Sequence, residues 1–351
     1  MTTLSLYDWA RITVKPAGTA KFRSLLEDFV VEETLRFEPS NEGAHHLLYI
    51  EKQNVNTDIV CHKLRRFADV KPLDIGYAGK KDRFAIARQW FSVQLPMLKE
   101  IDWQAFNDDE VTVLEATRHD KKLRIGAVKE NHFTITLRDF VGDKSLLAEK
   151  LNTIQEKGFP NYFGEQRFGH NGDNLTRGLD LLASNKRLKN RNLQGLLFSA
   201  VRSALFNHQV SQRVETGHFN ELLLGDYVQL DGSESGFVVE DLAKEVARYE
   251  QKDIHPCASL PGRGRSKLQQ DALTLEDKDL LEFAEVIDGL GRKGLQWDTR
   301  SIRVFPKSVI LNWLDEDTIK LEFSLPKGAF ATSFLRELFD LKQTINDSDK
   351  Q

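Results

Sequence analysis

One acidic side chain, Asp82, follows a glycine–lysine–lysine run and directly precedes Arg83. Two segments typical of β-strands flank it, at residues 75–78 and 87–94. A carboxylate on a tight turn between two strands, with three cationic neighbours, is expected to stay ionised at neutral pH. An ionised carboxylate suits a nucleophile or a general base better than a general acid. Residues 79–83 are equally typical of a solvated hairpin turn, because Gly, Asp and Lys favour turns.

The composition is that of a globular protein. The chain has 351 residues, of which 40% are hydrophobic and 29% charged, and this length allows two domains. No stretch approaches the roughly 18 consecutive apolar residues that a membrane-spanning helix needs. The N-terminus lacks the basic start and apolar core of a signal peptide. Cys61 and Cys257 are expected to be unpaired thiols in a reducing compartment. We therefore expect a cytoplasmic protein that does not bind a membrane.

The sequence holds no pattern typical of a metal or cofactor site. His45 and His46 are adjacent on a predicted strand, so their side chains point to opposite faces and we interpret them as structural. The glycines of residues 289–294 (GLGRKG) do not follow a predicted strand, which makes them a poor match to a dinucleotide-binding loop. We therefore predict no metal and no cofactor.

Basic residues cluster along the chain although the net charge is −4. Residues 60–90 carry eight Lys or Arg against three Asp or Glu, and residues 186–213 carry six basic residues and no acid. Residues 261–267 (PGRGRSK) add three more, whereas residues 271–288 hold seven acids and one lysine. Such segregation is typical of a surface that binds a phosphate backbone. If folding scatters these residues over several faces, they are ordinary solvated charges.

The hydrophobic pattern predicts an α+β protein of two domains. Alternating β-branched segments predict strands, and apolar residues at helical spacing predict helices. Besides the two segments that flank Asp82, the predicted strands are residues 29–33, 47–51, 111–115, 133–138, 227–230, 303–305, 308–313 and 318–323. The predicted helices are residues 57–67, 144–157, 174–183, 193–214, 239–252, 272–283 and 332–341. Strands at both chain ends around a helix-rich middle indicate one domain of residues 1–157 and 306–351, with an insertion of residues 158–305.

Six motifs resemble, in the same order, those of the TruD family of transfer-RNA pseudouridine synthases. They are EDFVVEE (27–33), GYAGKKD with QWFS (76–82 and 89–92), RH with KLRIG and NHF (118–119, 122–126 and 131–133), PNYFGEQRFG (160–169), SAVRSALFN (199–207) and LPKGAFATSFLREL (325–338). The resemblance extends from about residue 20 to about residue 340.

The resemblance implies a fold and a reaction. The implied fold is a pseudouridine-synthase catalytic fold with a mixed, mainly antiparallel sheet, plus an α/β insertion domain. The implied reaction isomerises uridine to pseudouridine in transfer RNA, at uridine 13, with Asp82 as the catalytic residue and the target base flipped out of its stack. This isomerisation breaks the bond between uracil and ribose and rejoins the base through its C5 atom. It therefore requires no redox change, phosphate energy or metal.

Three further residues are implied to bind the substrate. Phe29 and Phe330 would stack on the flipped base, and the amide of Asn131, which can both donate and accept, would read an edge of the uracil. From the residue pattern alone, the two aromatic residues are typical of a hydrophobic core. Asn131 is equally typical of a turn or a strand start.

A carboxylate in a dry pocket needs a cation beside it to remain charged. Lys81 is adjacent in sequence, but neighbours on an extended segment point apart. Arg23 is therefore the better candidate, although the family usually has lysine at this position and arginine changes the geometry. The resemblance also implies RNA contacts for four residues of the central basic motif, each of which singly is typical of ordinary surface charge: Arg118, His119, Lys122 and Arg124.

The expected partner is transfer RNA, and we expect a monomer with no obligate protein partner. Two alternatives remain open: a pseudouridine synthase acting on another RNA, and a non-catalytic RNA-binding protein on the same fold. Asp82 with its neighbours Gly79 and Lys81 favours an enzyme, because a pure binder needs no anion within a cationic surface.

Overall fold

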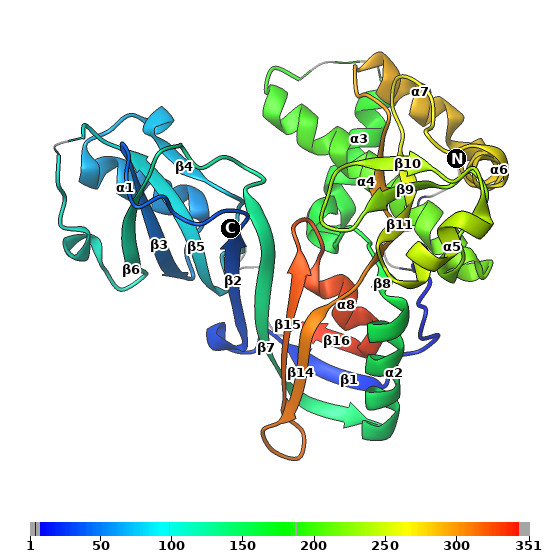
Figure 1. Cartoon of the computed structure of the whole chain (residues 1–351), viewed down its shortest axis with the longest axis horizontal. Coiled ribbons are helices and arrows are strands. Elements are labelled where there is room, and N and C mark those ends of the chain that lie inside the picture. The colour runs from blue at the N-terminus through cyan, green and yellow to red at the C-terminus, as the bar shows by residue number, and fades with distance from the viewer. Residues whose placement is uncertain (1–3, 5–7, 98, 185, 187, 344–351) are drawn as a thin grey trace. The chain divides into compact units, whose positions relative to one another are not determined.

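The computed structural model describes all residues except 1–3, 5–7, 98, 185, 187 and 344–351 (Figure 1). Contacts within the chain divide it into two compact units. Unit 1 comprises Met1–Pro16, Ala148–Phe305 and Ala329–Leu338, and unit 2 comprises Ala17–Leu147, Pro306–Gly328 and Phe339–Gln351. Both units are therefore discontinuous in sequence.

The two units resemble the predicted domains but have different boundaries. The predicted catalytic domain includes residues 1–16, 148–157 and 329–338. In the structure these residues belong to unit 1, together with the predicted insertion. The assignment of a catalytic domain to residues 1–157 and 306–351, and of an insertion to residues 158–305, stays a prediction.

Unit 2 is built around one ten-stranded sheet. Its elements are β1 (Gly18–Phe22), β2 (Phe29–Leu35), β3 (His45–Gln53), α1 (Thr57–Ala68), β4 (Ile75–Tyr77), β5 (Ile86–Gln94), β6 (Val111–His119), β7 (Val128–Gly142), β14 (Lys307–Trp313), β15 (Ile319–Pro326) and β16 (Phe339–Gln343).

The sheet of unit 2 is mixed and mainly antiparallel. Its strands follow the order β14-β15-β7-β2-β5-β3-β6, with β1 on β7, β16 on β1 and β4 on β5. Only the pairs β1–β16 and β2–β5 are parallel among the described strands. Figure 1 shows the long strand β7 between β2 and β15. The predicted sheet type is therefore confirmed.

Helix α1 covers one face of this sheet. Val60, Leu64 and Ala68 recur at helical spacing and are buried in a cluster with residues of β3, β5 and β6, including Phe91. The helix ends at Asp69, which adopts a left-handed conformation with φ 52°. This packing fixes the N-terminus of α1 beside the loop that precedes β5.

Unit 1 contains most of the helices. Its elements are β8 (Phe159–Pro160), α3 (Asp173–Ala183), α4 (Arg191–Glu215), β9 (Tyr227–Leu230), β10 (Gly236–Val238), α5 (Leu242–Glu250), β11 (Ile254–Leu260), α6 (Gln270–Leu280), α7 (Ala284–Arg292), β12 (Asp298–Ser301), β13 (Arg303–Val304) and α8 (Ala331–Leu338), while α2 (Lys144–Lys157) begins in unit 2 and continues into unit 1.

Helix α4 forms the centre of unit 1. Leu197, Val201 and Leu205 lie at four-residue spacing and are buried with Leu175 of α3 and Leu290 of α7. The antiparallel sheet β10-β9-β11-β12 packs on α4 through β11.

Most predicted elements are present, and the errors concern short segments. The sequence pattern did not predict the helix α7 or the strands β1, β8, β10, β11 and β12. The predicted helix over residues 332–341 is wrong at its end, because α8 stops at Leu338 and the chain continues as β16. Strand β16 pairs in parallel with β1, and such a distant partner leaves no signal in a local pattern.

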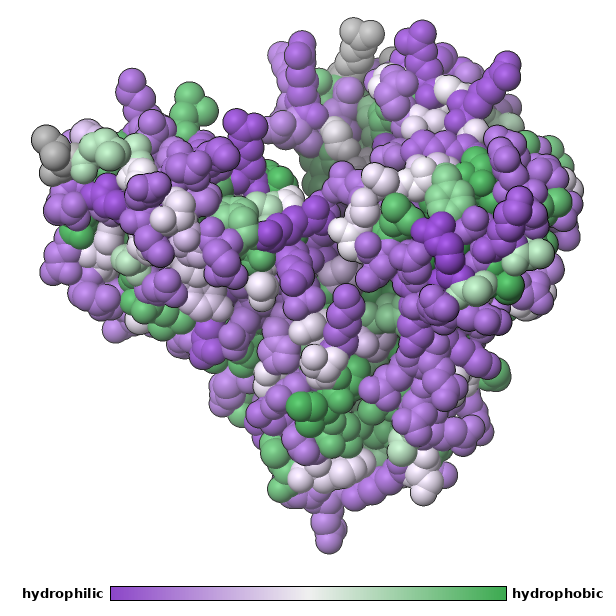
Figure 2. Space-filling model, in the orientation of Figure 1, coloured by the Kyte–Doolittle hydropathy of each residue, from purple (hydrophilic) through white to green (hydrophobic). Residues whose placement is uncertain are grey.

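The visible face of the molecule is mostly hydrophilic (Figure 2). A hydrophobic area lies over β14 and β15, where Ile310 is 49% exposed. No helix in the described part of the chain has the length and apolar character needed to cross a membrane. Cys61 and Cys257 are free thiols, as predicted.

Candidate active site

Asp82 lies in the loop between β4 and β5, which pair in antiparallel fashion. Side chains from neighbouring elements hold the main chain of this loop. Gln89 donates from Nε2 to the carbonyl of Gly79 over 3.1 Å, and the amide of Lys81 donates to Oγ1 of Thr57 over 3.1 Å. The hydroxyl of Thr57 donates in turn to Oε1 of Gln89 over 2.9 Å. The loop is therefore anchored to α1 and β5 rather than being a simple solvated turn.

The Asp82 carboxylate forms an ion pair with Arg23. The side chain of Asp82 is 41% exposed and that of Arg23 only 14% exposed. Arg23 is held over the ring of Phe29, with 4.1 Å between its guanidinium carbon and the ring centroid. The guanidinium is therefore fixed from behind, while the carboxylate remains accessible from outside.

The backbone of Arg23 is in the left-handed region, with φ 59°. For a residue with a side chain this conformation costs about 1–3 kcal/mol and tends to occur at functional sites. The Nε atom of Arg23 is also buried without a hydrogen-bond partner among the described residues. Both features indicate that the position of the guanidinium, rather than local stability, determines the conformation here.

Lys52 holds the Asp82 loop from inside the protein. It is 0% exposed, and its ammonium donates to the carbonyl of Asp82 over 2.7 Å and to the carbonyl of Val55 over 2.8 Å. Burial lowers the pKa of Lys52 to about 8, and the negative charge of Asp82 opposes this shift. Lys52 therefore both positions the loop and adds positive charge behind it.

Lys81 points away from the Asp82 carboxylate and connects two other strands. Its ammonium lies 2.9 Å from the carboxylate of Glu33 and donates to Oδ1 of Asn131 over 2.5 Å. Glu33 and Asn131 are direct partners across β2 and β7. Burial raises the pKa of Glu33, and the charge of Lys81 opposes the shift. Asn131 thus uses its oxygen internally, while its Nδ2 atom has no partner in the described part of the chain.

The central basic motif lies beside the β4–β5 hairpin. Leu123 donates its amide to Oγ of Ser92 over 2.9 Å, and Gly126 donates to the carbonyl of Ala78 over 2.8 Å. A Cβ atom at Gly76 would lie 2.2 Å from the carbonyl oxygen of Leu123, so only glycine permits this approach.

The four predicted RNA contacts of this motif have different surroundings. Arg118 pairs with Glu100 at 2.6 Å, and His119 stacks on Phe37 with 4.6 Å between ring centroids. The ammonium of Lys122 donates to a backbone carbonyl over 2.5 Å. Arg124 is exposed and forms no side-chain hydrogen bond or ion pair among the described residues, which leaves it as the most available of the four side chains.

Five of the predicted site residues lie together in unit 2, and a sixth belongs to unit 1. Arg23, Phe29, Lys81, Asp82 and Asn131 all belong to unit 2 and are linked by the contacts described above. Phe330 belongs to unit 1, where its ring lies 6.0 Å from that of Phe163. Phe29 is 4% exposed and Arg23 covers it, so its visible role is to support Arg23. Stacking of Phe29 or Phe330 on a base stays a prediction.

Two residues with clear structural roles were missed at the sequence level, Lys52 and Glu33. A usable signal existed for Lys52, because Leu48, Ile50 and Lys52 alternate along one strand and therefore share its buried face. A lysine at such a position is expected only where buried acceptors hold it. Glu33 lay within a recognised motif, but its pairing with Lys81 could not be inferred from spacing.

The arrangement presents the half-exposed Asp82 carboxylate, with Arg23 and Lys52 fixed behind it. Asn131 on β7 adds an amide donor. Such a carboxylate can act as a nucleophile or a general base. Among the described residues, no group of three or more His, Cys, Asp or Glu side chains could hold a metal ion.

Comparisons with known proteins define the family. The model of the family described as tRNA pseudouridine synthase D (TruD) matches residues 10–189 and 173–338. The tRNA pseudouridine synthase D of Proteus mirabilis is 41% identical over 326 residues, which cover 92% of this chain and 93% of that protein. The corresponding protein of Shewanella oneidensis is 43% identical over 93% of this chain and 87% of its own length. The chain belongs to the TruD family.

A solved structure shares the fold. The crystal structure of the TruD protein from Methanosarcina mazei matches with a TM-score of 0.74 and 20% identity, over 98% of each chain. The predicted fold class is therefore confirmed.

Proposed function

We propose that this protein isomerises uridine to pseudouridine in transfer RNA, at uridine 13, with Asp82 as the catalytic carboxylate. The observation that carries the proposal is the half-exposed Asp82 carboxylate, which Arg23 binds and whose loop Lys52 and Thr57 hold in place. Membership of the TruD family supports the reaction class. The choice of uridine 13 rests on the motif resemblance.

The reaction needs the target uridine outside its stack, because the atoms that react are covered in a stacked helix. Asp82 would then face the sugar and the C6 edge of the uracil. It acts there by attacking C1′ or C6, or by abstracting the 2′ proton. Each route breaks the N1–C1′ bond, forms a bond from C5 to C1′, releases the C5 proton and protonates N1, so atoms and electrons balance without a cofactor.

The neighbouring residues have distinct tasks in this proposal. Arg23 binds and orients the Asp82 carboxylate. Asn131 donates from Nδ2 to a uracil carbonyl, because Lys81 already occupies its oxygen. Arg124 binds a backbone phosphate beside the hairpin, and removal of this one contact reduces the salt dependence of binding.

Mapping of pseudouridine in cellular RNA tests the proposal. RNA from cells with and without this protein is treated with a reagent specific for pseudouridine and sequenced. The proposal expects loss of signal at position 13 of transfer RNA and its return when the gene is restored. Loss at a site in another RNA would support the alternative substrate, and no change at any site would leave a binding protein without catalysis.

A further inference from the structure

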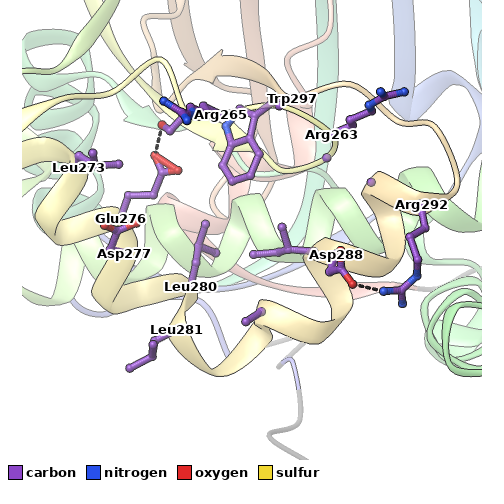
Figure 3. Close-up of a pocket in the computed structure, with 16 residues that line it drawn as sticks. Arg263, Arg265, Leu273, Glu276, Asp277, Leu280, Leu281, Asp288, Arg292 and Trp297 are labelled. Carbon is purple, nitrogen blue, oxygen red and sulfur yellow. Dashed lines mark hydrogen bonds and ion pairs between the residues drawn. The ribbon is translucent and has the colours of Figure 1, made fainter.

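Unit 1 contains a hollow of about 1140 Å³ that the proposed reaction does not use (Figure 3). One side is the arginine strap, residues 262–266 (GRGRS), and the other is formed by α6, α7 and the turn that joins them. A Cβ atom at Gly262 would lie 2.5 Å from the carbonyl oxygen of Leu295, so glycine allows the strap to pack closely. The strap is the basic cluster noted in the sequence.

A short chain of hydrogen bonds fixes an aromatic ring and a carboxylate in this hollow. The indole of Trp297 donates from Nε1 to Oγ of Ser259 over 2.8 Å, and this hydroxyl donates to Oε2 of Glu276 over 2.9 Å. Ser266 of the strap donates to the same Oε2 over 2.7 Å. A single serine hydroxyl therefore separates the indole from the carboxylate, and both are held in place before any ligand arrives.

Glu276 retains one free acceptor. It is 4% exposed, and its Oε2 atom receives both serine hydroxyls. Its Oε1 atom has no hydrogen bond among the described residues, although the side chain lines the hollow. Burial raises the pKa of Glu276, and the hydroxyls of Ser266 and Ser259 oppose the shift. Donors from a ligand would compensate this burial further.

The remaining lining gives the hollow an apolar floor and an edge that carries both signs of charge, with Asp277 exposed on α6. Leu280 extends towards the indole of Trp297 in Figure 3, and Leu281 is 77% exposed at the rim. Arg263 and Arg265 are exposed and have no ion-pair partner in the described part of unit 1. Arg292, by contrast, pairs with Asp288. An anionic group would therefore bind on the side of the strap.

These features match one ligand class. An indole face suits a nucleobase, and unpaired arginines suit a phosphate. Guanine is the base whose Watson–Crick edge carries two adjacent donors, N1–H and N2–H, which a carboxylate oxygen can accept together. The uracil N3–H lies between two carbonyls that a carboxylate repels.

We propose that this hollow binds one unpaired guanine nucleotide of the RNA substrate, with the base stacked on Trp297, its donor edge on Oε1 of Glu276 and the phosphate on an arginine of the strap. The inference rests on the proposed function, because an RNA must be the substrate. Since this contact is the same before and during the reaction, it contributes to RNA affinity and not to the chemical step.

Crosslinking locates the base directly. Transfer RNA transcribed with 6-thioguanosine is irradiated with the wild-type protein, and crosslinked peptides are identified by mass spectrometry. We expect a peptide from residues 259–297, and we expect unmodified transfer RNA to compete for it. Crosslinks only elsewhere in the chain, with normal pseudouridine formation, would overturn the inference and leave the proposed function intact. Saturable binding of guanosine monophosphate without an RNA crosslink at this place would also overturn it.

Kinetics test the two contacts. Trp297→Ala should raise KM about tenfold at unchanged kcat, because it removes the stacking surface, whereas Trp297→Phe should restore most of the affinity. Inosine lacks the N2 donor of guanosine. For the wild type, RNA with inosine in place of the crosslinked guanosine should have a KM about tenfold higher than unmodified RNA. For Glu276→Gln, the two RNAs should have the same KM. The surface variant Lys244→Gln should behave as wild type. An equal inosine effect in both proteins would refute the assignment of Glu276. Absence of any pseudouridine formation by the wild type would instead refute the proposed function.

Discussion

Asp82 and Glu276 are two carboxylates that the chain surrounds in opposite ways. Asp82 is half exposed, pairs with Arg23, and has the ammonium of Lys52 on its own carbonyl. Glu276 is buried, is bound by the hydroxyls of two serines, and has no cationic partner among the described residues. The first environment leaves an ion-paired carboxylate accessible to a substrate, whereas the second holds a buried carboxylate as a fixed hydrogen-bond acceptor. The difference shows how neighbouring cations or hydroxyls can assign distinct tasks to the same chemical group.

Loss of the ion pair between Arg23 and Asp82 should lower the reaction rate more than the other changes around Asp82 described below. Arg23→Gln removes the cation and should lower the single-turnover rate by about a hundredfold to a thousandfold, as loss of a key electrostatic contact does in other enzymes. Arg23→Lys keeps the charge and should retain most of the activity. A rate for Arg23→Gln within twofold of wild type would mean that Asp82 does not depend on this cation.

Lys52→Met should lower the rate by about tenfold to a hundredfold, because a small displacement of the Asp82 loop misplaces the carboxylate. Lys63→Met is a matched control, since Lys63 lies in the same unit and pairs with Asp108 and Glu110 rather than with the loop. Equal rates for the two variants would show that the loop does not need Lys52.

The lowered pKa of Lys52 predicts that both the reaction rate and the stability depend on pH. Because the pKa of Lys52 is lowered to about 8, the wild-type rate should fall as pH rises through about 8, and Lys52→Met should lack this limb. Stability should change in the opposite direction. The unfolded chain binds more protons between pH 8 and the usual lysine pKa, so wild type should gain stability relative to Lys52→Met as pH rises through this window. Parallel rate and stability profiles would contradict this account.

A pair of glycine variants tests how tightly the loop is held. Gly76→Ala would place a Cβ atom 2.2 Å from the carbonyl oxygen of Leu123 and should destabilise the protein by about 1–3 kcal/mol, as overpacking does. Gly79→Ala, with nothing within 4 Å of its added Cβ atom, should be close to neutral. Thermal unfolding measures both, and equal melting temperatures would refute the close approach of the two segments.

The smallest effect is expected at Glu276. Glu276→Gln keeps the shape and an acceptor for the serines, so the free energy of unfolding should change by no more than about 1 kcal/mol at pH 7. Because the pKa of Glu276 is raised in the folded state, wild type should lose stability relative to the variant as pH rises above the usual glutamate pKa. Chemical denaturation between pH 4 and pH 8 measures this difference. A constant difference would show that Glu276 does not titrate as described.

Sequence patterns identified much of this architecture where the interactions are local. The helical spacing of Val60 and Leu64 predicted α1, and alternation predicted the strands β3 and β7. Strand β16 was missed because its partner β1 lies more than three hundred residues away in the sequence. At the site, strand geometry alone argued that Lys81 points away from Asp82. The contact of Lys52 with Asp82 joins segments distant in the chain. The same is true of the hydrogen bonds through Ser259 that connect Trp297 to Glu276, and no local pattern contains either.

The most direct test of the central claim is the rate of pseudouridine formation by Asp82→Asn. This variant keeps the size of the side chain and removes its charge. With saturating transfer RNA under single-turnover conditions, we expect no pseudouridine above background, while the affinity for transfer RNA stays within a few-fold of wild type. Formation of pseudouridine at a rate near that of wild type would contradict the assignment of Asp82 as the catalytic carboxylate.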